Sequence, residues 1–268
     1  MRKLSDITHI GRIIDLRLAS NRAALLIPTG AALVLYGLDT SDIRRAIAGA
    51  MGSVAAWMLA RELDPDRPHA ATIAAFLAPA STLVLGAPAP AALFLTLFTA
   101  RILARTTGLP PRTTDYAGVG LGAVVFADTP WGWAVGILLA FAMVRDVALP
   151  GDPPMNAGLW GAVLAIGVTL RAAFGDRLGD WTAPDVTSLG FILFGLVGAA
   201  VVVQPIPVLS LGDWTRMPLE PRRVREAAVF TVLTAALAVL AGGQAGVVAV
   251  APLLMTFAAV AMTRIASR

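Results

Sequence analysis

The densest cluster of chemically capable side chains lies at residues 61–69, where six of nine positions are charged or carry an imidazole. Carboxylate oxygens are the ligands that Mg²⁺ prefers, and the ion usually keeps waters and substrate phosphates in its shell. An arginine can hold the same phosphate through two parallel hydrogen bonds. The pattern therefore predicts a Mg²⁺-dependent site for a phosphate-bearing substrate. Its candidate members are Glu62, Asp64 and Asp66 as catalytic residues, Asp64, Asp66 and His69 as metal ligands, and Arg61, Arg67 and Arg101 as phosphate-binding residues.

The same segment also fits a solvated turn between two helices. Pro65 and Pro68 restrict the residues before them to extended conformations, and aspartate is common in turns. Arg101 equally fits an arginine that extends from a helix end towards lipid headgroups. A weaker copy of the pattern at 145–152, with one arginine and two aspartates, suits either interpretation. The sequence leaves the enzyme site and the solvated turn both open.

Missing residue types exclude several classes of function. The chain has no cysteine, which removes disulfides, thiol catalysis and thiolate metal sites. His9 and His69 are the two histidines, too few for a histidine metal centre. No glycine-rich loop precedes a Lys and a Ser or Thr, so the chain is not an ATPase on its own. No Asp, Glu, Lys or His lies near the middle of a long apolar run, so the buried carboxylate of many proton-coupled carriers is absent.

The elements that must position the polar residues are ten apolar runs. Hydrophobic residues make up 57% of the chain and charged residues only 14%, with a mean hydropathy of +0.76. In soluble domains about a quarter of the residues are charged. The predicted fold class is therefore all-α, a polytopic helical integral membrane protein with about ten transmembrane segments. The runs occupy 23–38, 46–60, 70–87, 91–104, 116–127, 131–144, 157–170, 187–203, 227–241 and 245–263.

The positive charges fall almost wholly on alternate connections between these runs. If all ten runs cross the bilayer, 17 of the 21 Lys and Arg side chains lie on the side of the two termini. Short connections rich in Lys and Arg stay on the cytoplasmic side, so both termini are predicted to be cytoplasmic. The opposite side would hold only Arg44, Arg45, Arg171 and Arg177.

The basic pI near 10.5 also follows from this arrangement. Arginines at helix ends attract anionic lipid headgroups, so we expect the lipid bilayer and its anionic headgroups as partners, and no nucleic acid. A homo-oligomer or a partner subunit stays open. Abundant Ala, Arg, Gly and Pro beside a single Lys is typical of a GC-rich bacterial genome. The expected localisation is therefore a bacterial inner membrane.

Two domains are predicted, a cytoplasmic amphipathic interfacial arm over 1–22 and a single transmembrane helical domain over 23–268. Apolar residues recur in the arm at three- and four-residue spacing, as on the membrane-facing side of an interfacial helix. They are Ile7, Ile10, Ile14 and Leu18, accompanied by the basic residues Arg2, Lys3, Arg12 and Arg17.

Three details of the membrane domain bear on function. The loops before the third and seventh runs share an arginine, an acid and a Pro-Asp-Pro pattern, which favours two parallel four-helix repeats, spans 2–5 and 6–9. The run 116–127 is about 18 Å long as a helix against a hydrocarbon core of about 30 Å, so it either spans a thinned bilayer or is re-entrant. Prolines within or closing the runs predict kinks at Pro28, Pro79, Pro205, Pro207 and Pro252.

Three functions agree with this architecture. The first is a transporter or permease for a small or amphipathic solute, with its pathway between the two repeats and no cofactor. The second is a membrane enzyme that acts on lipid-linked phosphate at the cytoplasmic face and uses Mg²⁺ at the 61–69 cluster. The third is a non-catalytic membrane scaffold or assembly subunit. The kinked runs, the repeat pattern and the lack of a separate soluble domain favour the permease over an enzyme.

Overall fold

The protein is all-helical across the residues that the computed structural model describes, which are 7–11, 17, 19–152, 156–175 and 181–267. This confirms the predicted helical class. In these residues nine helices follow one another along the chain. They are α1 (Ala19–Leu38), α2 (Ile43–Leu63), α3 (Pro68–Leu85), α4 (Pro90–Ala104), α5 (Thr113–Phe126), α6 (Gly132–Val147), α7 (Ala157–Phe174), α8 (Val186–Val202) and α9 (Pro221–Ala266).

Helix α9 reverses direction at Gly243, so it forms two limbs, 221–242 and 244–266. Gly243 has φ +52° and ψ −129°, a conformation that side chains with a Cβ rarely adopt. A Cβ on Gly246 would lie 2.0 Å from the Ala238 carbonyl oxygen, which shows how closely the two limbs approach. With α9 divided in this way, each of the ten predicted apolar runs corresponds to one helical segment.

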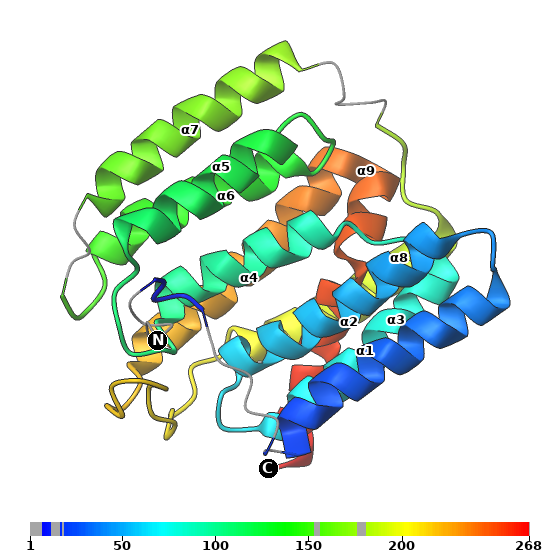
Figure 1. The fold of residues 1–268 in the computed structure, drawn as a ribbon, viewed down its shortest axis with the longest axis horizontal. Coiled ribbons are helices and arrows are strands. Elements are labelled where there is room, and N and C mark those ends of the chain that lie inside the picture. Colours follow the sequence, from blue (N-terminus) through cyan, green and yellow to red (C-terminus); the bar gives the residue numbers. More distant parts are fainter. Residues whose placement is uncertain (1–6, 12–16, 18, 153–155, 176–180, 268) are drawn as a thin grey trace.

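The helical segments lie side by side along a common direction and alternate in sense (Figure 1). One end of the bundle gathers the connections α2–α3, α4–α5, α6–α7 and α8–α9 together with the end of α9. Hydrogen bonds between the connections fix this end. The Asp66 carboxylate accepts from Ser210 N, the backbone N of Asp213 donates to Thr106 O, and Arg264 donates to the Asp64 carboxylate. We call it the arginine end.

The opposite end holds the remaining connections and fewer charges. Arg45 donates to the carbonyls of Thr82 and Leu83, and Arg171 is paired with Asp128. Most of the described arginines therefore lie at one end of the bundle, as the alternating charge pattern of the sequence predicts. Arg177, which was assigned to this opposite end, lies outside the described residues.

The second limb of α9 is the centre of the bundle. Its residues 246–261 are mostly buried, and α9 packs against α2, α3, α4, α6 and α8. The outer helices keep large apolar side chains exposed, including Leu33 on α1, Phe174 on α7 and Val197 on α8. Apolar surfaces of this extent are expected where hydrocarbon surrounds the protein. Together with the apolar helices they indicate a membrane-embedded protein.

Helix length limits how many segments cross a bilayer unaided. Among the described residues α1, α3, α7 and α9 are long and apolar enough to span, and α4 and α8 are apolar but shorter. Helix α5, with 14 residues, is about 21 Å long, well below the roughly 30 Å of a hydrocarbon core. Four candidate spans are therefore present by length and composition.

The proline predictions divide into two groups. Pro28, Pro79 and Pro252 lie inside helices as predicted, whereas Pro205 and Pro207 lie in the connection after α8. Pro79 cannot donate to the carbonyl four residues before it, Ala75 O. That carbonyl instead accepts a hydrogen bond of 2.8 Å from the Ser53 hydroxyl on α2. A side chain of the neighbouring helix thus replaces the lost backbone donor.

Most of the predicted interfacial arm lies outside the described residues, including Ile14, Leu18 and the basic residues Arg2, Lys3 and Arg12. The described stretch 7–11 is bent rather than helical. Ile10 is buried against the bundle while Ile7 is exposed. His9 N and the Thr8 hydroxyl both donate to the Asp115 carboxylate near the start of α5. This stretch therefore lies at the arginine end.

Candidate functional site

Glu62, a predicted catalytic residue, is fully buried at the end of α2 and paired with a residue of α4. Arg101 Nε donates to Glu62 Oε1 at 3.0 Å, and the Thr106 hydroxyl donates to Oε2. Arg101 also donates to the carbonyl of Ile10 at 3.0 Å. Both predicted residues therefore face one another, and Arg101 points into the bundle instead of extending to headgroups. Their contacts connect α2, α4 and the segment before α1.

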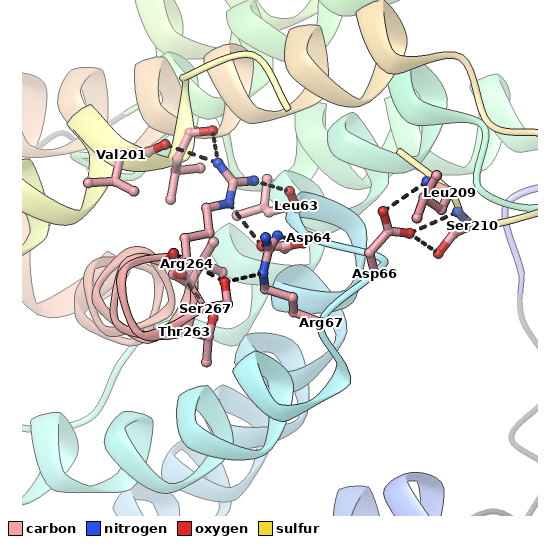
Figure 2. Close-up of polar contacts among 12 residues, drawn as sticks. Leu63, Asp64, Asp66, Arg67, Val201, Leu209, Ser210, Thr263, Arg264 and Ser267 are labelled. Carbon is pink, nitrogen blue, oxygen red and sulfur yellow. Dashed lines mark hydrogen bonds and ion pairs between the residues drawn. The ribbon is translucent and has the colours of Figure 1, made fainter. Parts of the chain in front are cut away.

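Asp64 is also fully buried and accepts from two arginines (Figure 2). Arg264 Nε on α9 donates to Oδ2 at 2.8 Å, and Arg67 Nη1 lies 3.2 Å from the same oxygen. Arg264 also donates to the carbonyls of Val201 and Val202 at the end of α8 and to Leu63 O. Carbonyls at a helix C-terminus lack intrahelical partners, so this arginine satisfies the ends of two helices at once.

The Asp66 carboxylate turns away from Asp64, towards the connection after α8 (Figure 2). It accepts from the backbone N of Leu209 and Ser210, both at 2.8 Å, and from the Ser210 hydroxyl. His69 is exposed near the start of α3. The structure therefore does not bring the three predicted metal ligands together. Among the described residues no three His, Cys, Asp or Glu side chains are placed to hold a metal ion.

A further buried carboxylate, Asp146 at the end of α6, accepts hydrogen bonds from three side chains. Arg223 Nη1 lies 2.6 Å from its Oδ1, Arg105 Nη2 lies 3.1 Å from Oδ1 and 3.2 Å from Oδ2, and the Tyr116 hydroxyl donates to Oδ2 at 3.0 Å. We call this group the Asp146 cluster. It connects α4, α5, α6 and α9.

The sequence carried only part of the signal for the Asp146 cluster. Residues 145–152 resemble the 61–69 segment, which pointed to Asp146 as a possible site residue. Arg223 is one of the helix-end arginines for which the sequence predicts contact with lipid headgroups, and nothing in the sequence around Tyr116 links it to Asp146. Their convergence depends on which helix ends meet, and that is a property of the packed bundle.

Two pockets at the arginine end lie close to the buried carboxylates. The first, of about 300 Å³, lies between the 61–69 segment and the connection after α8, and its charged lining residues are Arg61, Asp213 and Arg216. The second, of about 230 Å³, adjoins the Asp146 cluster and is lined by Arg105, Arg223, Gly151, Asp152 and Glu220 among others. None of the predicted catalytic carboxylates, Glu62, Asp64 and Asp66, lines either pocket.

A third pocket differs in chemistry and in position. It has a volume of about 210 Å³ and lies between the middle of α8 and both limbs of α9. Every lining residue is apolar: Ile192, Gly195, Leu196, Ala199, Val232, Ala235, Ala236, Val239, Leu240, Leu254 and Phe257. Leu196 and Leu240 are both more than half exposed, so the pocket opens sideways to the surroundings of the bundle. We call it the α8–α9 cleft.

Comparisons with known proteins place no constraint on these sites, because no family model, curated protein or solved structure matches the chain.

Proposed function

We propose that the chain is a multispanning protein of a bacterial inner membrane that acts as a permease for an amphipathic solute. All ten helical segments would cross the bilayer, and the arginine end would face the cytoplasm with both termini. The charge distribution supports this orientation, because Lys and Arg are retained on the cytoplasmic side. Two parallel repeats, spans 2–5 and 6–9, remain part of the proposal. They correspond to α2–α5 and to α6–α8 with the first limb of α9.

The short helices are compatible with ten spans if the bilayer adapts to them. Helices α4, α5 and α6 have 15, 14 and 16 residues and lie next to one another in the bundle. Local thinning costs a fraction of a kcal/mol per Å of mismatch, which a well-packed bundle can offset. Because α5 runs from Asp115 at the arginine end to the end that holds Asp128, we favour a span over a re-entrant segment.

The α8–α9 cleft is the observation that carries the permease proposal. It lies at the middle of α8, it is open to the lipid side, and its walls are wholly apolar. Such a cleft suits the alkyl part of an amphipathic solute that enters from the bilayer, because small-molecule sites are concave and mainly apolar. The non-helical Gly243 and the helix proline Pro252 both precede Leu254, which forms part of the cleft wall. Segments of this kind are typical hinge positions.

The test measures movement of amphipathic probes in proteoliposomes. NBD-labelled phosphatidylglycerol and NBD-labelled fatty acid in the inner leaflet become accessible to external dithionite only after they cross. We expect wild type to accelerate crossing of at least one probe over protein-free liposomes. Ala236→Trp, which places an indole in the cleft, should reduce that acceleration about tenfold or more.

Leu193→Trp is the matched control, because Leu193 is exposed on α8 and does not line the cleft. It adds the same indole and should retain wild-type rates. Equal crossing in wild-type and protein-free liposomes for both probes would contradict the proposal and favour a scaffold. The enzyme alternative gains no support from the geometry, because Glu62, Asp64 and Asp66 are all engaged by protein donors.

A further inference from the structure

We propose that the pocket beside the Asp146 cluster binds a phosphate-type oxyanion, either free phosphate or the phosphate of a lipid headgroup. The inference does not rest on the permease function. Arg223 faces this pocket, whereas Val232 of the α8–α9 cleft lies nine residues further along the same limb. Nine residues turn a helix through about 900°, which places the two sites on opposite faces.

The charges of the Asp146 cluster do not balance. Two guanidinium groups, on Arg105 and Arg223, meet a single carboxylate, and the exposed fractions of the three residues are 9%, 3% and 0%. The third partner, Tyr116, donates a neutral hydroxyl. An uncompensated charge that is shielded from water is strongly unfavourable, so a buried excess cation points to an anionic ligand.

The other buried carboxylates at the arginine end show a different arrangement. Glu62 is paired with Arg101, and the Thr106 hydroxyl also donates to it. Asp64 has two arginines, but the Arg67 side chain is 33% exposed, so water solvates its charge. At the Asp146 cluster, by contrast, both arginines that pair with the carboxylate are deeply buried.

Arg105 has a donor that the described residues do not satisfy. Its Nη1 donates to Asp152 O at 2.8 Å and its Nη2 to Asp146, but its Nε is buried without a hydrogen-bond partner among them. Buried side-chain donors are satisfied in most proteins, so each exception needs a cause. Arg105 also has φ +49°, a left-handed conformation that is unusual for a residue with a Cβ. This backbone holds the guanidinium at the pocket wall.

The backbone in front of the two guanidinium groups leaves room for a ligand. Gly151 has φ +105°, and a Cβ there would lie 3.6 Å from Arg105 Nη1 and 4.0 Å from Arg223 Nε. The pocket volume of about 230 Å³ is several times the roughly 30 Å³ that a water molecule occupies in the liquid. Arg223 donates to the Asp146 carboxylate and to the carbonyls of Leu103, Asp146, Leu149 and Pro150, so it contributes its charge to the pocket. The donor left for a phosphate oxygen is the Nε of Arg105.

Two carboxylates also line the pocket, and they determine how the anion is held. Asp152 and Glu220 are exposed at its rim, where water and salt screen them, and the arginines are the buried wall. The Asp152 carbonyl already accepts from Arg105. The pocket therefore has a cationic inner wall and an acidic rim. We expect the rim to weaken the binding of a free anion but not to abolish it.

Binding is tested with the full chain in neutral detergent and in nanodiscs. Inorganic phosphate is titrated at constant ionic strength against chloride, and thermal unfolding is followed by tryptophan fluorescence. A second arm compares phosphatidylglycerol nanodiscs with nanodiscs of digalactosyldiacylglycerol, a neutral lipid that has no phosphate. A ligand that binds only the folded state raises the melting temperature. We expect a rise with phosphate, with phosphatidylglycerol, or with both, and the arm that responds identifies the source of the oxyanion.

The variants decide whether the rise comes from this pocket. Gly151→Leu fills the space before the arginines, and Gly86→Leu is the matched control, because Gly86 has the same φ of +105° but only Val248 Cγ1, at 4.0 Å, near its Cβ position. Gly151→Leu should weaken the response at least tenfold, and Gly86→Leu should retain it. Arg105→Lys keeps the charge but loses the fork and should weaken phosphate binding about tenfold.

Two results would overturn the proposal. One is a melting temperature that responds to neither phosphate nor phosphatidylglycerol. The other is a response of equal size in wild type and Gly151→Leu, which would show a general salt or surface-charge effect. If Arg105→Lys does not fold, the pair Gly151→Leu and Gly86→Leu still decides the question.

Discussion

Buried arginines in this protein pair with a carboxylate and donate to backbone carbonyls at the same time. Arg264 pairs with Asp64 and also donates to the last carbonyls of α2 and α8. Arg223 does the same with Asp146, Leu103 O and Pro150 O. A guanidinium has five donors in a fixed plane, so it can satisfy a carboxylate and several carbonyls together, which lysine cannot. This donor geometry gives a physical reason for arginine, and not lysine, at these buried positions.

The Glu62–Arg101 pair should respond strongly to removal of one partner. Glu62→Gln leaves Arg101 buried without its counter-charge and should lower the free energy of unfolding by about 3–5 kcal/mol. The double variant Glu62→Gln/Arg101→Met should recover a large part of that loss, because no lone charge remains. Thermal unfolding in detergent measures both.

Arg145→Gln provides the control for this measurement. It breaks the Arg145–Glu226 pair, whose side chains are 32% and 22% exposed, and should change stability by about 1 kcal/mol or less. If Glu62→Gln has an effect as small as Arg145→Gln, the buried pair is not a significant source of stability.

The sequence pointed to some of the charged residues that lie buried at the arginine end, but not to their contacts. Glu62, Asp64 and Arg101 stood out by type, and the structure buries all three. The sequence could not say that Asp64 pairs with Arg264, 200 positions away, because that contact depends on how two helix ends meet. Aspartates near prolines fit a metal site and a turn equally well, and the partners of Asp66 are backbone amides that no side-chain pattern reveals.

At the scale of elements, apolar runs identified helices well and connections poorly. Every run became a helical segment, because a backbone surrounded by apolar side chains must satisfy its own hydrogen bonds. The connection 203–220 lies between two apolar runs, and the run pattern predicts no structure for it. It forms a short antiparallel contact between Leu211 and Pro218 and covers the α4–α5 connection through Asp213 N and Trp214 N. Hydrophobic periodicity carries no information on such loops.

The reversal at Gly243 should be sensitive to a single methyl group. A Cβ at this position would lie 2.1 Å from Thr182 O and would require a left-handed conformation. Strained conformations of this kind cost of order 1–3 kcal/mol, and the clash adds to it, so Gly243→Ala should lower the melting temperature clearly. Gly118→Ala is the control, because Gly118 lies in α5 with nothing within 4 Å of its Cβ position. It should be neutral or stabilising by about 0.5–1 kcal/mol.

Equal melting temperatures for Gly243→Ala and Gly118→Ala would contradict a tight reversal at Gly243.

At the scale of the whole molecule, the bundle separates its charges between two ends. Buried ion pairs connect α2 with α4 and α9, and α6 with α4 and α9, all at the arginine end. At the other end the described ion pair is Arg171–Asp128, and the Arg171 side chain is 45% exposed. Buried ion pairs therefore hold the helices together at the arginine end. The side of the membrane on which this end lies can be measured.

The chain has no cysteine, so single cysteines can report this orientation directly. Ser41 is exposed in the α1–α2 connection, and Thr113 is exposed at the start of α5. We expect a membrane-impermeant maleimide to label Ser41→Cys in intact cells with a permeabilised outer membrane. Thr113→Cys should react only after the inner membrane is opened. The reverse labelling pattern would invert the proposed orientation, and labelling of both from outside would contradict ten spans.

The hydrogen bond from Ser53 to Ala75 O has a consequence for biogenesis. A proline-containing α3 that entered hydrocarbon alone would carry an unpaired carbonyl, at a cost of several kcal/mol. The donor that removes this cost belongs to α2, which is synthesised first and is joined to α3 by a connection of four residues, 64–67. We therefore expect the translocon to release α2 and α3 into lipid together as a hairpin, with the serine hydroxyl joining them before the later helices arrive.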